Sequence, residues 1–432
     1  MTSRSRLNRR TFLKTAAAAG AAAAFPALVP STALAAAGNN APGNRITLGL
    51  IGAGGRGVGV MKDFMAHEGV QVLAVCDVDK AHLDPVVAAV NKHYGNSDCA
   101  GYGDFREITR RDDIDAVLIG TPDHWHVLTA LDAVRNGKDA YVEKPLAYSI
   151  HEGRVLSDAV ASEKRILQTG SQQRSDARFR QACELVRNGR IGRLHAIHVG
   201  IPGNNKTCEP TWQPQPVPDG FDYNMWLGPA PWAEYHEQRC HYTFRFILDY
   251  SGGQVTNFGA HNLDIVQWAL DMDASGPVEI SGNAEFPTSG LFTTATKVYF
   301  ECVYENGVHL TCRTGRFGIH FEGSEGYIYV DRDEIRAVPE DILKQPLGDG
   351  DLRLYASDDH VGNFLECIRT REQPICNAEV GHRSSSICNL GNIAMVLGAR
   401  KLRWDPATET FPDSPEANAM VKPTMREPWV LA

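Results

Sequence analysis

The chain has 432 residues, of which 43% are hydrophobic and 22% are charged, and its formal net charge is −9. This length exceeds what one hydrophobic core supports, so we expect a folded protein of two domains. The acidic balance argues against a nucleic-acid partner, and no segment beyond the N-terminus reaches the roughly 20 apolar residues that span a bilayer.

The first 35 residues have the organisation of an export signal. The paired arginines Arg9 and Arg10 precede an alanine-rich apolar run, and the small residues at 33–35 suit a signal peptidase. This order is typical of the twin-arginine type, which exports folded proteins. An uncleaved anchoring helix is the alternative, and the shortness of the run argues against it. We predict a signal over residues 1–35, a linker over 36–44 and a periplasmic or otherwise extracytoplasmic location.

Strands and helices alternate after the linker. An apolar strand over 46–51 turns through glycines into a helix, a second strand covers 70–76, and strand–helix pairs continue to residue 162. Such alternation is typical of parallel βαβ units in a doubly wound sheet. We therefore predict an α/β protein with a Rossmann domain over residues 45–165.

The second half has a different pattern. A Pro-, Trp- and Tyr-rich stretch over 202–242 is too long for an ordinary connection, and its aromatic residues favour an ordered structure. A helix near 260–270 precedes consecutive strand-like segments with short turns between 278 and 330, which indicates an antiparallel sheet. We predict an α+β domain over residues 166–432, whose C-terminal helix packs back on the Rossmann domain.

Ten cysteines occur in the chain, and none forms a Cys-x-x-Cys motif. The sequence therefore gives no support to a metal-binding or thioredoxin-like reading. Cys302 with Cys312, or Cys208 with Cys240, could form a disulfide in an oxidising compartment. The other interpretation is that most cysteines are small buried hydrophobic residues.

The turn after the first strand has the spacing of a nucleotide-binding motif. Glycines at G-x-G-x-x-G spacing allow a tight turn and bring backbone N–H groups to a pyrophosphate. Asp77 ends the second strand, where a carboxylate accepts from both ribose hydroxyls and repels a 2′-phosphate. A purely structural turn with a helix-capping Asp77 is the alternative. The combination predicts NAD rather than NADP. The expected contacts in the turn are Gly52, Gly54, Gly55, Arg56 and Gly57.

Lys144 and Pro145 follow a strand over 140–143. Ligands of open α/β sheets bind at the carboxyl edge of the strands. A partly desolvated lysine at that edge has a depressed pKa and can exchange a proton with a substrate hydroxyl. On this segment alone, a surface lysine beside a helix start is an equal alternative.

Three motifs together resemble the Gfo/Idh/MocA family, which includes glucose-fructose oxidoreductase and inositol dehydrogenase: the glycine turn, the segment 121–126 and Glu143-Lys144-Pro145. The second half is similar to an exported subgroup. The motifs that carry this similarity lie at 226–231, 249–253, 259–261 and 381–384. The resemblance implies a large open sheet that holds the substrate, a homo-oligomer (dimer or tetramer) formed through that sheet, and a cis Lys-Pro peptide. It also implies oxidation or reduction of a secondary alcohol of a sugar, cyclitol or polyol.

The resemblance extends to a helix of the second domain, where such enzymes carry an Asp and a His four residues apart. This chain has Asn257 and His261, followed by Asp264. His261 matches the acid/base histidine, and Asp264 matches a position that binds substrate hydroxyls. Asn257 departs from the pattern, because an amide cannot hold the charge that stabilises an imidazolium. Either Lys144 and His261 suffice for alcohol oxidation, or the chemistry has moved away from simple dehydrogenation.

Further site residues are expected on weaker grounds. His124, His126 and His261 could gather a metal, but their spacing does not require one, and we predict no metal site. The catalytic set is Lys144, His261 and Asn257. Additional cofactor contacts are expected from Thr121, Pro122, His124, Trp125, His126, Glu143, Lys144, Gln172 and Arg174. Substrate contacts are expected from Lys144, Arg174, Tyr223, Arg245, His261 and Asp264.

These features predict an NAD-dependent oxidoreductase that acts on a secondary hydroxyl of a sugar, glycoside or cyclitol. NAD is scarce outside the cytoplasm, so we expect it to be tightly bound. The alternative is a redox-neutral enzyme that cleaves or epimerises a glycoside with bound NAD. A noncatalytic sugar-binding relative is a third hypothesis, suggested only by Asn257.

Overall fold

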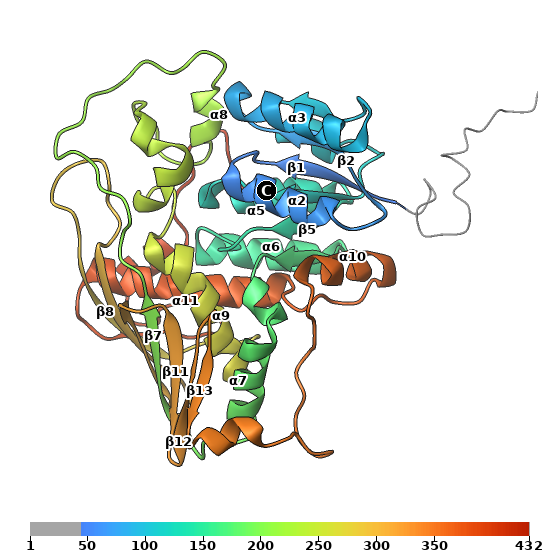
Figure 1. Cartoon of the computed structure of the whole chain (residues 1–432). Coiled ribbons are helices and arrows are strands. Elements are labelled where there is room, and N and C mark those ends of the chain that lie inside the picture. The colour runs from blue at the N-terminus through green and yellow to red at the C-terminus, as the bar shows by residue number, and fades with distance from the viewer. Residues whose placement is uncertain (1–44, 432) are drawn as a thin grey trace, which may run out of the picture. The chain divides into compact units, whose positions relative to one another are not determined.

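The computed structural model describes residues 45–431, so the predicted signal and linker lie outside the described part of the chain. Two β-sheets organise these residues (Figure 1). The first has six parallel strands in the order β3-β2-β1-β4-β5-β6. In chain order they are β1 (Ile46–Ile51), β2 (Val70–Cys76), β3 (Ala100–Tyr102), β4 (Ala116–Ile119), β5 (Asp139–Val142) and β6 (Leu167–Thr169).

Helices cover both faces of the first sheet, as the strand–helix alternation predicts. The helices are α2 (Gly55–Met65), α3 (Lys80–Tyr94), α4 (Phe105–Thr109), α5 (Asp123–Arg135) and α6 (Ile150–Ser162). Helices α2 and α3 cover one face of the sheet, where their side chains Phe64 and Leu83 are buried. Helices α4, α5 and α6 cover the other face, where Phe105, Leu131 and Leu156 are buried. This layering confirms the predicted Rossmann architecture.

The second sheet is mixed and mainly antiparallel, as predicted. Its eight strands have the order β13-β12-β11-β7-β10-β9-β8-β14, and only β7 and β10 pair in parallel. They are β7 (Leu194–Ile201), β8 (Glu279–Glu285), β9 (Lys297–Val303), β10 (His309–Thr314), β11 (Gly318–Gly323), β12 (Gly326–Val330), β13 (Ile335–Val338) and β14 (Leu402–Arg403).

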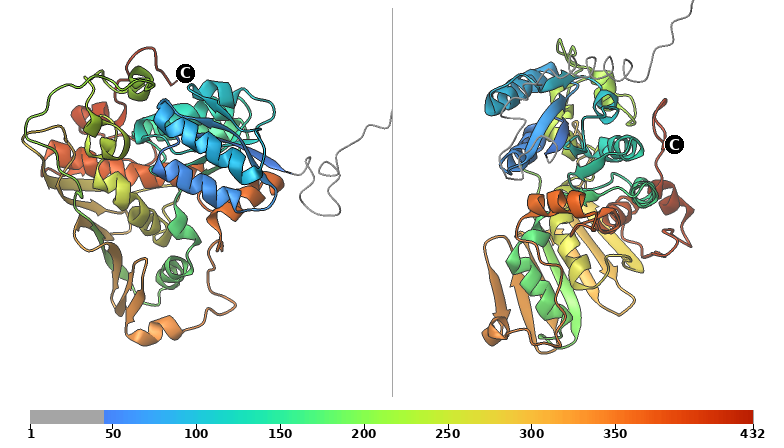
Figure 2. Two further views of the ribbon diagram at one scale, coloured as in Figure 1. Left: turned by 45° about the horizontal axis from the view of Figure 1, so that its top comes forward. Right: turned by 90° about the vertical axis from the view of Figure 1, so that its right-hand side faces the viewer.

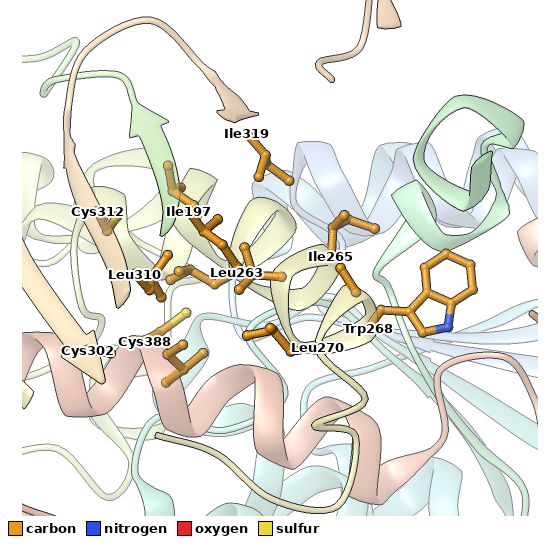
Figure 3. Packing of buried hydrophobic residues seen from close by; sticks show 14 of the residues in the cluster. Ile197, Leu263, Ile265, Trp268, Leu270, Cys302, Leu310, Cys312, Ile319 and Cys388 are labelled. Atoms are coloured by element: carbon orange, nitrogen blue, oxygen red, sulfur yellow. The ribbon is translucent and has the colours of Figure 1, made fainter. Parts of the chain in front are cut away.

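Helices α7 (Ala177–Arg187), α9 (Ala260–Ala269) and α11 (Ala378–Leu397) pack against the second sheet. Figure 3 shows Leu263 and Ile265 of α9 among side chains of β7, β10 and β11. Figures 1 and 2 place α11 between the two sheets. A Cβ atom on Gly381 would meet Thr169 of β6, so α11 lies directly against the first sheet as well.

The boundary expected at residue 165 falls within the first sheet, because β6 pairs with β5. Helix α10 (His360–Thr370) also returns to this sheet, and the Phe364 ring lies 5.9 Å from the rings of Phe64 and Tyr141. All ten cysteines are free, including Cys302 and Cys312 on the neighbouring strands β9 and β10. Among the described residues, none of the helices has the length and apolarity needed to cross a membrane.

Residues 202–250 form a long segment, here called the strap, which lies beside the first sheet near α3 (Figures 1 and 2). It contains α8 (Tyr223–Leu227), two short 3-10 helices and its own aromatic core. The N–H of Lys80 donates to the Gly220 carbonyl at 3.1 Å, and the N–H of Asp222 donates to the Val78 carbonyl at 2.8 Å. These bonds attach the strap to the carboxyl edge of the first sheet.

Candidate active site

A cleft of about 580 Å³ follows the carboxyl edge of the first sheet. Residues that directly follow β1, β2, β4 and β5 line one side, and the strap lines the other. This is the edge at which doubly wound sheets bind ligands. The predicted site residues that line the cleft are Gly52, Gly54, Arg56, Gly55, Asp77, Thr121, Pro122, Trp125, His126, Glu143, Lys144, Arg245 and Asn257.

The glycines of the turn serve two purposes. Gly52 has a φ of +93°, and a Cβ atom on Gly57 would lie 2.1 Å from the Gly52 carbonyl oxygen. These positions need glycine because backbone passes close to backbone. A Cβ on Gly54 or Gly55 would meet nothing within 4 Å, so open space lies before the N-terminus of α2. A pyrophosphate fits such a space, because free N–H groups and the helix dipole favour an anion there.

Asp77 lies beside the glycine turn at the end of β2. Its Oδ2 accepts from the N–H of Ala53 at 2.7 Å, and its Oδ1 accepts from the N–H of Asp79 at 2.9 Å. These two bonds fix the carboxylate at the cleft wall, and each oxygen keeps a second lone pair. The arrangement suits a ribose diol.

Lys144 lies at the end of β5, and its peptide bond to Pro145 is cis. The Nζ atom donates to the carbonyl of Asn257 at 2.7 Å and to the Asn257 Oδ1 at 3.3 Å. Burial lowers the pKa of Lys144, while the carboxylates of Glu143 and Asp123 oppose that shift. The amine is therefore held in one position and loses its proton more readily than an exposed lysine does.

Glu143 ties the glycine turn to β5. The Arg56 Nε and NH2 atoms both contact Glu143 Oε1 at 2.7 Å, and Gln172 donates to the same oxygen at 3.3 Å. Gln172 also donates to the Tyr141 hydroxyl at 2.8 Å and does not line the cleft. Glu143 and Gln172 thus hold the glycine turn and β5 together at the cleft.

His261 is buried on α9, directly after the π-helical turn Val255–Gly259. Burial lowers its pKa well below the usual value, and the positive charges of Lys144 and Arg332 lower it further. Its Nδ1 atom has no hydrogen-bond partner among the described residues. The lowered pKa favours the neutral imidazole, and Nδ1 is an unused nitrogen, but the side chain does not line the cleft described above.

Comparison with known families identifies the fold and its signal. Residues 46–171 match the NAD-binding Rossmann fold of the Gfo/Idh/MocA oxidoreductase family, and residues 204–431 match the C-terminal alpha/beta domain of that family. The chain belongs to the Gfo/Idh/MocA family. Residues 6–26 match the twin-arginine translocation signal, which confirms the predicted export to the periplasm.

Curated relatives of this Gfo/Idh/MocA chain include glycosidases. The glycosyl hydrolase family 109 protein 2 of Shewanella sp. strain ANA-3 is 37% identical over 173 residues, which are 37% of this chain and 38% of that protein. An alpha-N-acetylgalactosaminidase of Shewanella oneidensis is 34% identical over 177 residues, or 37% of this chain and 39% of that protein. The alignments thus span about two fifths of these relatives.

Solved structures share the whole architecture. The aldose-aldose oxidoreductase from Caulobacter crescentus, complexed with glycerol, has a TM-score of 0.62 and 17% identity over 83% of this chain and 99% of its own. The WlbA dehydrogenase from Bordetella pertussis, in complex with NADH and UDP-GlcNAcA, has a TM-score of 0.62 and 15% identity over 84% of this chain and 99% of its own. At these identities the likeness shows the fold.

Several predicted ligand contacts, Gly57 among them, do not line the cleft, and three of these residues have polar partners inside the protein. Arg174 and Asp264 are 1% and 0% exposed and form an ion pair at 2.9 Å, and Asp273 takes the other side of the guanidinium at 2.7 Å. Tyr223 is buried in the strap, where its hydroxyl donates to the Ala233 carbonyl at 2.9 Å. Each of these polar groups has a partner inside the protein, and the structure does not bring them to the cleft.

The histidines of the segment 121–126 are held by backbone carbonyls. His124 Nε2 and Trp125 Nε1 both contact the Trp226 carbonyl, at 3.1 and 2.9 Å, and so join the strap to α5. The His126 nitrogens contact the Pro145 and Thr121 carbonyls at 2.7 and 2.9 Å. His124 does not line the cleft, which corrects its expected cofactor contact.

Asp123 is a cleft residue that the sequence reasoning missed. Its Oδ2 accepts from the hydroxyl of Ser251, directly after the strap, at 2.6 Å, and both residues line the cleft. Arg245 lines the same part, with its guanidinium 4.0 Å from the Tyr242 ring. The signal for Asp123 was its place directly after the Thr121-Pro122 that follows β4, since an acid there faces the ligand edge.

Proposed function

We propose that this protein is an NAD-dependent enzyme that oxidises a secondary hydroxyl of a sugar, glycoside or cyclitol. One observation carries the proposal: the Lys144 amine and the glycine turn line the same cleft at the carboxyl edge of the first sheet. A dinucleotide laid from Asp77 across Gly54 and Gly55 would extend along that edge toward Lys144. The cleft therefore provides a cofactor site and a basic group for one reaction.

The residues of the cleft fit NAD. The open space at Gly54 and Gly55 would hold the pyrophosphate, and Asp77 would accept from the ribose hydroxyls and repel a 2′-phosphate. NAD, when bound, would supply the acceptor for the hydrogen that leaves the substrate carbon with its electron pair. Thr121, Trp125 and His126 would line the other end of the cofactor site.

Lys144 would take the proton of the substrate hydroxyl. Its amine is buried, so the neutral form that accepts a proton is available at lower pH than in water. Asn257 fixes the position of Nζ through its carbonyl and Oδ1. His261 would act as a neutral hydrogen-bond acceptor near Lys144 rather than as an imidazolium, which explains how Asn257 can replace a charged residue.

Tight retention of NAD is part of the proposal. The strap covers the cleft through Tyr242, Phe244 and Arg245 and is attached to α5 by the Trp226 carbonyl. A cofactor beneath it could leave only if these contacts opened. The twin-arginine signal supports loading before export, because that route carries folded proteins.

A second candidate is redox-neutral cleavage of a glycoside. In this scheme, oxidation of a ring hydroxyl would acidify the neighbouring C–H, and elimination would release the aglycone as its alcohol. Water would then add to the resulting double bond, and reduction of the ketone by the reduced cofactor would restore the hydroxyl. The relatives named as family 109 glycosyl hydrolases favour this candidate, although they align over two fifths of their length. Lys144 would serve as the base in both schemes.

The test uses the full chain as purified. Mass spectrometry of the denatured protein should show one NAD per chain, and a chain without dinucleotide that binds no added NAD would overturn the proposal. The protein is then incubated with free aldoses and with nitrophenyl glycosides, including an α-N-acetylgalactosaminide. Oxidised sugar with net NADH indicates the dehydrogenase, whereas released sugar without net NADH indicates the glycosidase.

The second sheet would also join subunits. Helices cover one face only, and the other face carries Tyr299, which is 43% exposed, together with the half-exposed rings of His198 and His320. A broad face of this kind suits a symmetric dimer or tetramer. Light scattering should give a mass of two or four chains, and Tyr299→Glu should shift it toward one.

A further inference from the structure

One cluster of metal-type ligands lies outside the chemistry described so far. Asp79 and His82 stand at the start of α3, and His241 comes from the strap. Ligand atoms of the three side chains lie within 4.8 Å of one another. The cluster therefore unites two segments that are far apart in the sequence, which is why spacing alone predicted no metal site.

One ligand pair of the cluster already has the spacing expected around a small tetrahedral cation. Zn–N and Zn–O bonds of about 2.0–2.2 Å place two ligand atoms roughly 3.4 Å apart. His241 Nε2 lies 3.4 Å from Asp79 Oδ2, and the imidazole rings of His82 and His241 have centroids 4.5 Å apart. Two imidazoles and one carboxylate are the donors that zinc prefers, and a fourth position would stay open to water.

The surroundings hold two of the three ligands in place. Asp79 Oδ1 accepts from the N–H of Ala81 at 2.9 Å, so the N-cap bond orients the carboxylate and leaves Oδ2 for the cluster. The His241 ring stacks on Phe221 with centroids 5.6 Å apart.

We propose that Asp79, His82 and His241 bind a zinc-class divalent cation that fastens the strap to the nucleotide-binding half. His82 and His241 line the cleft beside Asp77, so the cation would close the end of the cleft where the ribose is expected. The strap already contacts this point through the Gly220 carbonyl and the Asp222 N–H. The consequence for cofactor retention depends on the proposed function, whereas the metal site itself does not.

The site is tested on the full chain purified without a histidine tag and stripped with a chelator. Zinc chloride is titrated by calorimetry, and bound zinc is measured by mass spectrometry. We expect one zinc per chain, lost or weakened at least about 10-fold in His82→Gln and in His241→Gln. His93→Gln is the matched control, because His93 is exposed on the same helix outside the cluster, and it should bind zinc like the parent.

Cobalt gives an independent readout, since a tetrahedral Co²⁺ site has intense visible absorption that the two cluster variants should lack. Absence of stoichiometric zinc uptake, or full uptake by either cluster variant, would overturn the site. Release of NAD is then timed with and without zinc, and we expect zinc to slow it at least about 10-fold. Zinc uptake with unchanged NAD release would overturn the fastening role, and a chain that binds zinc but no NAD would contradict only the proposed function.

Discussion

At the residue scale, the environment of Lys144 determines what its amine can do. Burial makes the ammonium form costly, the nearby carboxylates of Glu143 and Asp123 compensate in part, and Arg245 adds to the cost. The net effect lowers the pKa of Lys144, so its neutral form is reached at lower pH than in an exposed lysine. A base of this kind is suited to removing a hydroxyl proton.

Lys144→Met should remove the base and keep most of the side-chain volume. We expect kcat to fall by about 10²- to 10⁴-fold, the usual contribution of a positioned acid or base, with unchanged NAD content. Turnover of the best substrate and NAD per chain are measured together. Lys62→Met, at an exposed position on α2, is the control. Full activity in Lys144→Met would contradict the assignment.

The pH profile provides a second prediction for Lys144. The active amine is neutral, so kcat/KM should rise with pH through a pKa below the ordinary lysine value of 10.5. The Asp123 carboxylate raises this pKa by stabilising the ammonium. Asp123→Asn should therefore move the rising limb to lower pH, whereas Lys144→Met should remove it. A limb that stays in place in Asp123→Asn would contradict this assignment.

Residue-level prediction brought residues to the cleft where a short motif fixes the position. The glycine turn, Asp77 and Lys144 could be found because each directly follows a strand at the ligand edge. Arg174 and Asp264 could not be excluded from the site, since sequence does not reveal that they pair with each other in the core. Their burial is a property of the tertiary structure.

At the element scale, α2 shows that two glycines of one helix have different requirements. A Cβ on Gly57 would lie 2.1 Å from the Gly52 carbonyl oxygen, whereas a Cβ on Gly59 would meet nothing within 4 Å. The helix is thus packed against the turn at one position and free at the other. The close approach at Gly57 shapes the space for a phosphate.

Gly57→Ala should push α2 away from the turn and weaken NAD binding. We expect loss of retained NAD and destabilisation of about 1–3 kcal/mol, the usual cost of overpacking. Gly59→Ala should keep NAD and gain roughly 0.5–1 kcal/mol, because alanine is the better helix former. Urea denaturation and NAD per chain distinguish the two variants. Equal NAD content and equal stability of the two variants would show that the close contact at Gly57 affects neither NAD binding nor stability.

Element prediction was accurate where the hydrophobic pattern was long. The expected strands over 46–51 and 70–76 are β1 and β2 with the same bounds. Strand β3, with only three residues, carries too little pattern to be found, and the π-helical turn Val255–Gly259 has no sequence signature. Asn257 lies inside that turn and His261 follows it, so the spacing between them differs from that of a regular α-helix.

At the scale of the whole molecule, α11 connects the two sheets. Glu379 of α11 accepts from both terminal nitrogens of Arg154 on α6 at 2.8 Å, from Arg383 at 2.8 Å and from the Ser157 hydroxyl at 2.9 Å. Sequence could not predict this cluster, because its members come from helices that only the tertiary fold brings together. The cluster fixes α11 against α6, and thereby the second sheet against the nucleotide site.

Glu379→Gln should weaken this junction in a pH-dependent way. Burial alone would raise the pKa of Glu379, but the bonds from Arg154, Arg383 and Ser157 outweigh it and lower the pKa from 4.5 to about 2. The charged form therefore stabilises the fold above about pH 4.5, and this stabilisation is lost as pH falls toward 2. Because Glu379 is partly exposed, we expect a loss of roughly 1–2 kcal/mol at neutral pH.

Urea denaturation of the parent and of Glu379→Gln at a series of pH values measures the difference. The difference between their urea midpoints should be largest at neutral pH. It should narrow as the pH falls below about 4.5, because the Glu379 carboxylate of the parent then gains a proton and resembles the amide. Glu366→Gln, at an exposed position of α10, should match the parent throughout. A gap that persists undiminished in acid would mean that Glu379 contributes through packing, and the junction between α6 and α11 would then not depend on its charge.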